Sequence, residues 1–319
     1  MRRENIFLKR GVPLICIVGA TGTGKTDDAL ELASYLESKG IEAEIINVDS
    51  KGVYKYLKAL CAIPERKHHL VEFLPPDKRI SAVFFAKLMN YCLYSMFNKG
   101  IFPILCGGTG FYFEVFFYGV DNIPADGELR NLISVALEDD ELRFKIWRYL
   151  KKVYEYQIHF NDKKRLSRWI ENYVLVGSKV RKKRFMSLFF PVFFHKRIDF
   201  DERLKERYKT RYLKMLEEGA LEEVKFVVEN YGVDAPACYD VISFDDTYDI
   251  LLGKIDEEKA AFNYSKKAWR FAKKQERWFN RYERYAQQER CYYQRYGNVK
   301  ELFEVADKIL DFYRDTELL

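Results

Sequence analysis

Proline, flexible linkers and long apolar runs are scarce in this sequence. Only 8 of the 319 residues are proline, and no stretch rich in proline, glycine or serine separates one part from another. No apolar run is long enough to cross a membrane, and none of signal-peptide length follows Met1-Arg2-Arg3-Glu4. We therefore expect a cytoplasmic protein without membrane association, folded as one large domain or two smaller ones.

Cysteine and histidine form no pattern typical of a metal site. The six cysteines include no C-x-x-C pair, and Cys16 and Cys106 lie in apolar runs, so we interpret them as reduced core residues. His68 and His69 are adjacent, and adjacent residues of an extended chain point to opposite sides. We interpret this pair as structural.

Basic and aromatic residues are plentiful and gather in two places. The net charge is +6, and aromatic residues make up 16% of the chain. Lys164, Arg165 and Arg168 adjoin Trp169, and residues 266–284 carry basic side chains interleaved with aromatic ones. Such mixtures suit phosphate backbones and stacked bases. The alternative is a helix with an apolar face and a solvated basic face.

Residues 19–26 match the phosphate-binding pattern G-x-x-x-x-G-K-[ST], with Gly19, Ala20, Thr21, Gly22, Thr23, Gly24, Lys25 and Thr26. Residues 14–18 before them predict a buried parallel strand, and a helical pattern follows. Backbone N–H groups of residues 22–26 and Lys25 would bind phosphate, and the Thr26 hydroxyl would hold Mg²⁺. The alternative, a glycine-rich turn with a chance lysine, is disfavoured by the flanking elements. The loop predicts a bound diphosphate or triphosphate without specifying the reaction.

Strand-like and helical segments alternate through much of the chain. Residues 41–48, 101–106 and 189–198 predict strands, whereas 81–98 and 202–218 predict helices. This alternation predicts an α/β core with a parallel sheet. We assign residues 1–120 and 188–319 to that core, with 51–80 irregular and the last third helical. Residues 121–187 show only helical patterns and predict an all-helical insertion that ends near an exposed basic run at 181–184.

Polar residues follow the predicted strands where a parallel sheet places its ligands. Asp49 could be a general base, a magnesium ligand or an ordinary strand-terminal carboxylate. Thr109, within Gly107-Gly108-Thr109-Gly110, could donate to a phosphate or base, or belong to a plain tight turn. Arg203, Arg207 and Arg211 share one helix face, which is either functional or simply solvated and paired with nearby acids.

Several short motifs, taken in order, resemble the tRNA dimethylallyltransferase family over residues 14–278. Beside the phosphate loop, they are Asp49-Ser50 with Tyr54, His68-His69-Leu70, residues 106–112, Asn161-Asp162 with residues 165–168, Arg207 with Arg211 and Met215-Leu216, and residues 271–275 with Trp278-Phe279. Each motif is weak alone, but their joint order and spacing are specific. The chain departs from the family pattern at Gly52, residues 59–64, Ser243-Phe244 and Trp269.

The resemblance implies a P-loop NTPase-like core with a parallel sheet, plus an all-helical insertion that binds tRNA. By position, Asp49 matches the family's general base, and Thr26 and Arg211 match residues that hold the diphosphate together with Lys25. Thr26 would also bind Mg²⁺. The implied tRNA contacts are Asp49, Ser50, Lys51, Gly52, Thr109, Arg130, Lys164, Arg165, Leu166, Ser167 and Arg168.

The expected activity is transfer of a dimethylallyl group from dimethylallyl diphosphate to the exocyclic amine of the adenine next to the anticodon in tRNA. We expect the chain to need Mg²⁺ and to act as a monomer. One alternative is a P-loop kinase or NTPase that uses Asp49 as base for a hydroxyl acceptor. Two others are a non-catalytic tRNA-binding relative and a prenyltransferase for free adenylate, the latter disfavoured by the long basic C-terminal region.

Overall fold

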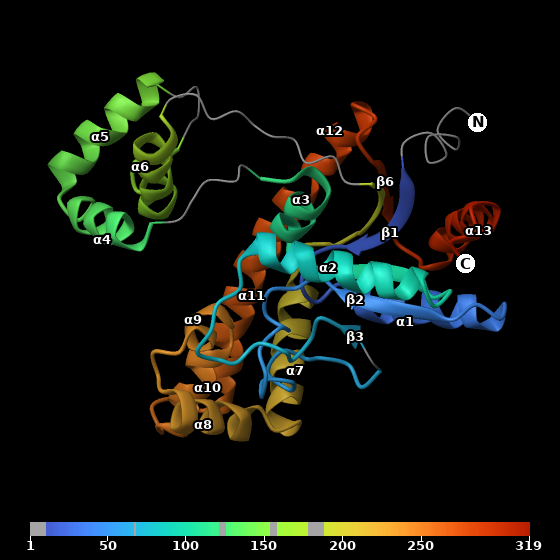
Figure 1. Ribbon diagram of the computed structural model, residues 1–319. Helices are drawn as coiled ribbons and strands as arrows, with labels where there is room; N and C mark the ends of the chain where they lie inside the picture. The colour runs from blue at the N-terminus through green and yellow to red at the C-terminus, as the bar shows by residue number, and fades with distance from the viewer. Residues whose placement is uncertain (1–10, 67, 121–125, 154–157, 178–187) are drawn as a thin grey trace. The chain divides into compact units, whose positions relative to one another are not determined.

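The computed structural model describes residues 11–66, 68–120, 126–153, 158–177 and 188–319. Contacts divide the chain into two compact units. The core unit consists of Met1–Phe117 with Ser187–Leu319, and the insertion unit consists of Tyr118–Met186 (Figure 1). The core unit is thus assembled from two separate stretches of sequence. The basic run at 181–184 lies outside the described residues.

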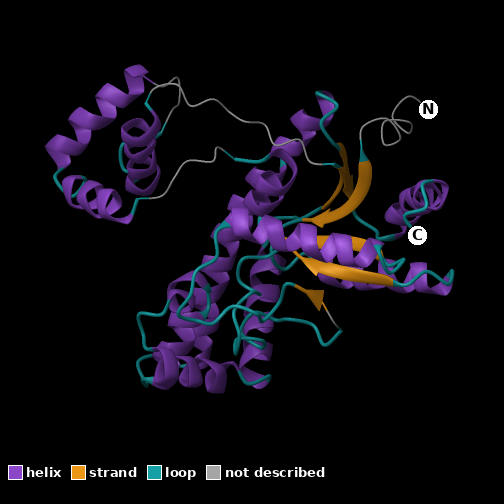
Figure 2. Ribbon diagram, viewed as in Figure 1, coloured by secondary structure: helices purple, strands orange, loops and turns teal. Residues whose placement is uncertain are grey.

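In the described part of the core unit, six strands form a central parallel sheet (Figure 2). In spatial order the strands are β3 (His68–His69), β2 (Ala43–Asn47), β4 (Phe102–Gly107), β1 (Val12–Val18), β5 (Phe189–Lys196) and β6 (Tyr292–Tyr296). Every neighbouring pair is parallel, with Ile15 of β1 opposite both Ile104 and Val192. The central strands are continuous apolar runs because helices cover both of their faces.

One apolar core lies between the sheet and helices α1 (Lys25–Ser38) and α13 (Lys300–Asp315). Leu32 of α1 and Leu302 of α13 are both fully buried there against alternate residues of the strands. Aromatic rings line β5 on another side: Phe193 contacts Phe113 of α3 (Gly110–Tyr118) and stacks on Tyr282 of α12 (Arg281–Gln287) with centroids 4.0 Å apart. The strands that precede the phosphate loop and its neighbouring loops are therefore packed against buried apolar and aromatic side chains.

The remaining helices of the core unit are α2 (Ala82–Phe97), α7 (Glu202–Glu217), α8 (Ala220–Tyr231), α9 (Pro236–Asp240), α10 (Phe244–Leu251) and α11 (Glu257–Phe279). Helices α7 and α11 pack along each other, with Tyr212 stacked on Tyr264 at a centroid distance of 5.1 Å. The Tyr212 hydroxyl also contacts Thr247 of α10 at 2.9 Å. These contacts hold α7 and α11 together, and each helix also hydrogen-bonds to Thr21 of the phosphate loop.

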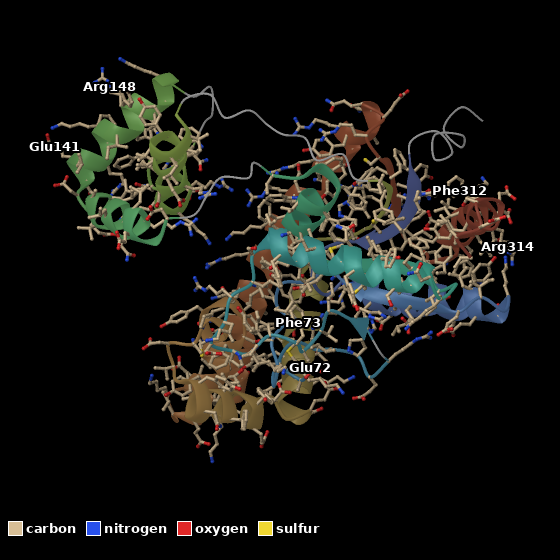
Figure 3. The ribbon with its side chains drawn as sticks, in the orientation of Figure 1. Glu72, Phe73, Glu141, Arg148, Phe312 and Arg314 are labelled. Atoms are coloured by element: carbon tan, nitrogen blue, oxygen red, sulfur yellow. The ribbon has the colours of Figure 1, made fainter. Side chains whose placement is uncertain are left out.

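The described part of the insertion unit is helical, with α4 (Gly127–Ala136), α5 (Asp140–Val153) and α6 (Lys163–Val176). Its small apolar core contains Ile133, Leu150 and Leu166. Glu141 and Arg148 of α5 are exposed to solvent (Figure 3). The unit thus combines a small apolar core with charged side chains on its surface, while apolar side chains such as Leu132 and Val135 are also exposed.

The predicted α/β class and parallel sheet are confirmed, but two local predictions are wrong. Residues 51–80, expected to be irregular, contain strand β3, and the last third, expected to be helical, contains strand β6. Both are short edge strands, whose formation depends on the neighbouring strand rather than on local pattern. Gly219 follows α7 with φ of 102°, as expected for a helix-ending glycine, and it also opens α8. Within the described residues, no helix is both long and apolar enough to span a membrane.

Candidate active site

The phosphate loop joins β1 to α1 and is held in shape by contacts along its length. The Thr23 hydroxyl donates to the Ala20 carbonyl at 2.9 Å. Gly22 has φ of 75°, and a Cβ there would lie 2.5 Å from a ring carbon of Tyr208. Glycine is therefore required at this position both by the backbone conformation and by the close packing of α7.

Lys25 lies at the start of α1, and burial lowers its pKa from the ordinary value. The positive charge of Arg211 acts in the same direction, while Cys106 and Asp49 oppose the shift. Its ammonium group contacts the Ala20 carbonyl at 3.4 Å. A partly desolvated cation with so few partners favours an anionic ligand, which would restore the free energy lost on burial.

Asp49 follows β2, and its loop is packed against the glycine loop that follows β4. The Asp49 Oδ1 atom accepts from the Lys51 N–H at 2.9 Å. The Ser50 N–H donates to the Thr109 hydroxyl at 3.0 Å, and the Thr109 N–H donates to the Val48 carbonyl. A Cβ on Gly107 would lie 2.0 Å from the Val48 carbonyl oxygen, so only glycine permits this approach. Thr109 thus holds the loop that carries Asp49.

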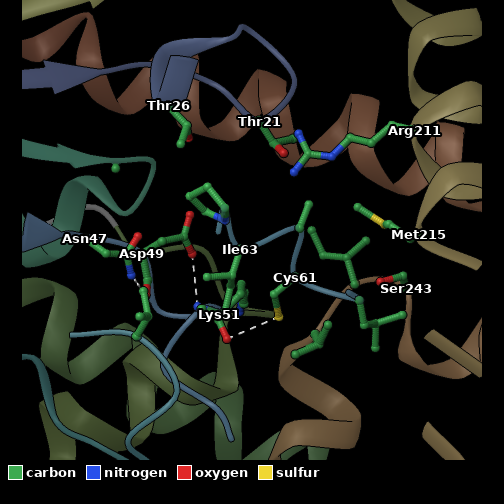
Figure 4. Close-up of a pocket in the computed structure, with 18 of the residues that line it drawn as sticks. Thr21, Thr26, Asn47, Asp49, Lys51, Cys61, Ile63, Arg211, Met215 and Ser243 are labelled. Atoms are coloured by element: carbon green, nitrogen blue, oxygen red, sulfur yellow. Dashed lines mark hydrogen bonds between the residues drawn. The ribbon is translucent and has the colours of Figure 1, made fainter. Parts of the chain in front are cut away.

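One pocket of the core unit brings these features together (Figure 4). Its polar lining includes Thr21, Lys25, Thr26, Asn47, Asp49, Lys51 and Arg211, and Gly52 also lines it. Its apolar lining includes Leu60, Cys61, Ile63, Met215 and Phe271. The pocket can therefore accommodate an anionic group joined to a hydrocarbon chain.

Arg211 differs from the two arginines that share its helix face. Arg203 and Arg207 are exposed, whereas Arg211 is half-buried and extends from α7 into the pocket (Figure 4). Its Nε atom is buried and has no hydrogen-bond partner among the described residues. A buried donor without a partner is costly, which favours an anionic ligand at this point.

The insertion unit carries a separate basic groove around Glu171, a residue that is only 1% exposed. Arg130 Nε donates to both carboxylate oxygens at 2.9 and 3.0 Å, Arg168 donates at 2.5 Å, and the Asp126 N–H donates at 3.1 Å. Burial opposes ionisation of Glu171, but these donors outweigh it and lower the pKa. Lys163, Lys164 and Ser167 also line the groove.

The structure shows where three side chains of the predicted basic surfaces lie. Leu166, predicted among the tRNA contacts, is fully buried in the insertion unit, so its side chain belongs to the core rather than to the groove. Arg165 is largely exposed and pairs weakly with Asp162 at 3.4 Å. In helix α11, Lys267 pairs with Asp245 and Asp246, which removes it from the free basic face.

Comparison with known proteins agrees with these features. Residues 53–282 match the family model for IPP transferase. The chain belongs to the IPP transferase family. A tRNA dimethylallyltransferase of Natranaerobius thermophilus is 31% identical over 97% of this chain and 93% of that protein. One of Caldicellulosiruptor saccharolyticus is 33% identical over 68% of this chain and 73% of that protein.

Two solved structures share the fold of this IPP transferase family member. The tRNA isopentenylpyrophosphate transferase of Bacillus halodurans superimposes with a TM-score of 0.63 at 23% identity, covering 96% of this chain and 99% of that one. A eukaryotic dimethylallyltransferase acting on tRNA gives a TM-score of 0.68 at 21% identity, covering 91% and 75%. At these identities the structures support the architecture of the core.

Sequence reasoning assigned no role at the site to three side chains that the structure places there. Tyr208 donates its hydroxyl to the Thr21 carbonyl at 3.0 Å, and Gln275 accepts from the Thr21 N–H at 2.8 Å. His68 lines the pocket, with Nδ1 2.7 Å from the Arg66 carbonyl and a buried Nε2 that has no partner in the described part of the chain. Burial lowers the pKa of His68, which favours the neutral form of the ring. The family motifs contained His68 and Gln275 but did not reveal these contacts.

Proposed function

We propose that this chain transfers the dimethylallyl group of dimethylallyl diphosphate to the exocyclic amine of the adenine next to the anticodon in tRNA. The observation that carries the proposal is a single pocket lined by Lys25, Thr26, Arg211 and Asp49. The cationic side chains can stabilise a diphosphate leaving group, and the carboxylate can accept a proton. The relatives named tRNA dimethylallyltransferase support the same reaction.

The reaction requires one proton acceptor and one site for negative charge. As the amine nitrogen forms a bond to the allylic carbon, the carbon–oxygen bond to the diphosphate breaks and its electron pair leaves with the diphosphate. The amine is a poor nucleophile because the ring withdraws its lone pair, so Asp49 takes its proton as the new bond forms. Lys25, Arg211 and the loop N–H groups stabilise the leaving diphosphate.

The roles of the two Asp49 oxygens differ. Oδ1 is held by the Lys51 N–H at 2.9 Å, and Oδ2 has no hydrogen-bond partner among the residues that the structure describes. Oδ2 is therefore the atom that would receive the proton. The apolar side of the pocket, with Leu60, Ile63 and Met215, would hold the hydrocarbon part of the donor and exclude water from the developing cation.

A magnesium ion fits the donor set of the pocket. The Thr26 hydroxyl stands at the start of α1 and lines the same pocket as Asp49, and Mg²⁺ prefers such oxygen ligands together with phosphate oxygens. Thr26 would hold the ion against the diphosphate. When bound, the ion would neutralise part of the charge on the leaving group.

We assign tRNA binding to the basic surfaces of both units, each considered by itself. In the insertion unit these are Arg130, Lys164, Arg165, Ser167 and Arg168, and in the core unit the exposed side chains of α11. Ser50, Lys51, Gly52 and Thr109, beside the base, would contact the target nucleotide. The proposal includes action as a monomer in the cytoplasm.

The test is incubation of the purified chain with total tRNA, Mg²⁺ and radiolabelled dimethylallyl diphosphate, followed by nucleoside analysis. Label in a prenylated adenosine is the expected result. A second incubation with labelled ATP tests the kinase alternative. Turnover of ATP without prenyl transfer would refute the proposal, and tight tRNA binding without either reaction would identify a non-catalytic relative.

A further inference from the structure

The side chain of Gln275 on helix α11 is buried between two loops of the active site. It is 5% exposed. Its Oε1 accepts from the Thr21 N–H at 2.8 Å, and its Nε2 donates to the Gly108 carbonyl at 3.0 Å. The two bonds require opposite ends of the amide, so they fix its orientation. One side chain thereby joins segments that lie 254 and 167 residues away in the sequence.

These two contacts connect the two chemical parts of the pocket. Thr21 belongs to the phosphate loop. Gly108 precedes Thr109, whose hydroxyl accepts from the Ser50 N–H directly after Asp49. Gln275 therefore bridges the loop that would hold the diphosphate and the loop that would hold the base.

The surroundings of Gln275 leave little room for adjustment. A Cβ on Gly108 would lie 2.3 Å from the Gln275 Nε2 atom, and one on Gly110 would lie 2.1 Å from the Trp278 ring. Thr21 is also held from its other side, because the Tyr208 hydroxyl donates to its carbonyl. Since the Thr21 N–H is committed to Gln275, phosphate binding is left to the N–H groups that follow it in the loop. Gln275 thus acts as a spacer of fixed length.

We propose that Gln275 is a positioning residue, which sets the separation between the bound diphosphate and the base Asp49. The inference rests on the proposed prenyl transfer. In that reaction the amine, the allylic carbon and the leaving oxygen must lie in line, and errors of about 1 Å cost on the order of 100-fold in rate. Gln275 touches neither the proton nor the leaving group, so its effect is on geometry alone.

Two substitutions test the bridge. Gln275→Met has nearly the same size and removes both hydrogen bonds. Gln275→Glu retains an acceptor for the Thr21 N–H but, when ionised, places a carboxylate against the Gly108 carbonyl. The same change to methionine at exposed Gln287 of α12 is the matched control. Single-turnover transfer, diphosphate affinity, tRNA affinity and thermal unfolding are measured on all four proteins.

We expect both Gln275 variants to lose roughly 10- to 100-fold in the rate at saturating substrates, while both affinities stay within about threefold. The pH profile adds a readout that a purely structural role would not alter. A buried carboxyl group has a raised pKa, so Gln275→Glu should become a neutral donor as the pH falls. Its rate relative to wild type should then recover, and that of Gln275→Met should not.

Different results overturn different claims. Normal transfer in both variants, or a rate loss explained entirely by lost affinity or unfolding, would overturn the positioning role while leaving the proposed function intact. A constant ratio of the Gln275→Glu rate to the wild-type rate across pH would also count against it. Absence of prenyl transfer by the wild-type chain would overturn the proposed function, and the positioning role with it.

Discussion

Replacing Asp49 by asparagine separates a general base from a ligand of the metal. The change keeps the size of the side chain and removes its basicity. The Lys51 N–H can still donate to the remaining oxygen, as it does to Oδ1 at 2.9 Å, so the loop should keep its shape. The other position, Oδ2, becomes an amide that faces the pocket and cannot accept a proton.

The expected effect of Asp49→Asn follows from the different roles of the two carboxylate oxygens. Loss of a positioned general base costs roughly 100- to 10,000-fold in rate, which corresponds to about 2.7–5.5 kcal/mol of activation free energy. Because the Lys51 contact survives and Asp49 is only half-buried, the free energy of unfolding should change by no more than about 1 kcal/mol. Diphosphate affinity should persist, since the phosphate loop and Lys25 supply that binding.

The assay measures magnesium-dependent diphosphate binding and single-turnover transfer on the same preparations. Asp27→Asn is the matched control, because Asp27 is an exposed carboxylate in the first turn of α1 and its loss changes the charge equally. Retained binding with lost transfer supports the base. Lost binding together with lost transfer indicates a metal ligand, and unaltered transfer would refute the assignment of Asp49 to catalysis.

Three further changes probe the rest of the two units. Arg211→Ala should cost about 2–4 kcal/mol of transition-state stabilisation with little effect on folding, and near-normal turnover would contradict a catalytic role for Arg211. Replacing Arg165 and Arg168 by alanine should weaken tRNA binding and flatten its salt dependence, measured by titration at several salt concentrations, while diphosphate affinity holds. The free energy of unfolding, measured by circular dichroism at several pH values, should depend less on pH in Glu171→Gln than in wild type. The lowered pKa of Glu171 contributes stability above the ordinary carboxyl pKa of about 4.3, and this contribution disappears as the pH falls through the folded value; identical pH profiles would contradict it.

The phosphate loop could be predicted from the sequence because its requirements are local. Gly22 needs a positive φ, and Lys25 and Thr26 must open a helix directly after a buried strand. These conditions involve adjacent residues, so they leave a pattern in the chain. The parallel sheet is predictable for a similar reason, since central strands buried on both faces must be continuously apolar.

The short edge strands could not be predicted in the same way. β3 contains only His68 and His69, and its pairing depends on β2, more than twenty residues earlier. The same holds for β6, which forms beside β5 after a long helical segment. Such strands gain their stability from one neighbour, and local sequence carries little of that information.

Periodicity placed Arg203, Arg207 and Arg211 on one face of α7, and only the tertiary structure distinguishes them. Packing of α7 against the phosphate loop leaves Arg211 half-buried in the pocket, whereas Arg203 and Arg207 are exposed to solvent. Likewise, Leu166 and Arg165 are neighbours in sequence, but Leu166 is buried in the small core of the insertion unit and Arg165 is exposed to solvent. Residue spacing predicts which side chains share a helix face, whereas long-range packing determines whether each of them contacts protein or solvent.

The phosphate loop and the strand before it are determined by consecutive residues, because their backbone conformation and their apolar pattern depend on adjacent positions. The connection between that loop and Asp49 cannot be predicted from adjacent residues, because it involves Gln275, which lies 254 residues after Thr21 in the sequence. A side-chain amide can join two loops only after the sheet, α7 and α11 have brought them within hydrogen-bonding distance. The tertiary structure therefore decided how the parts of the site are held together, because that depends on contacts between distant segments.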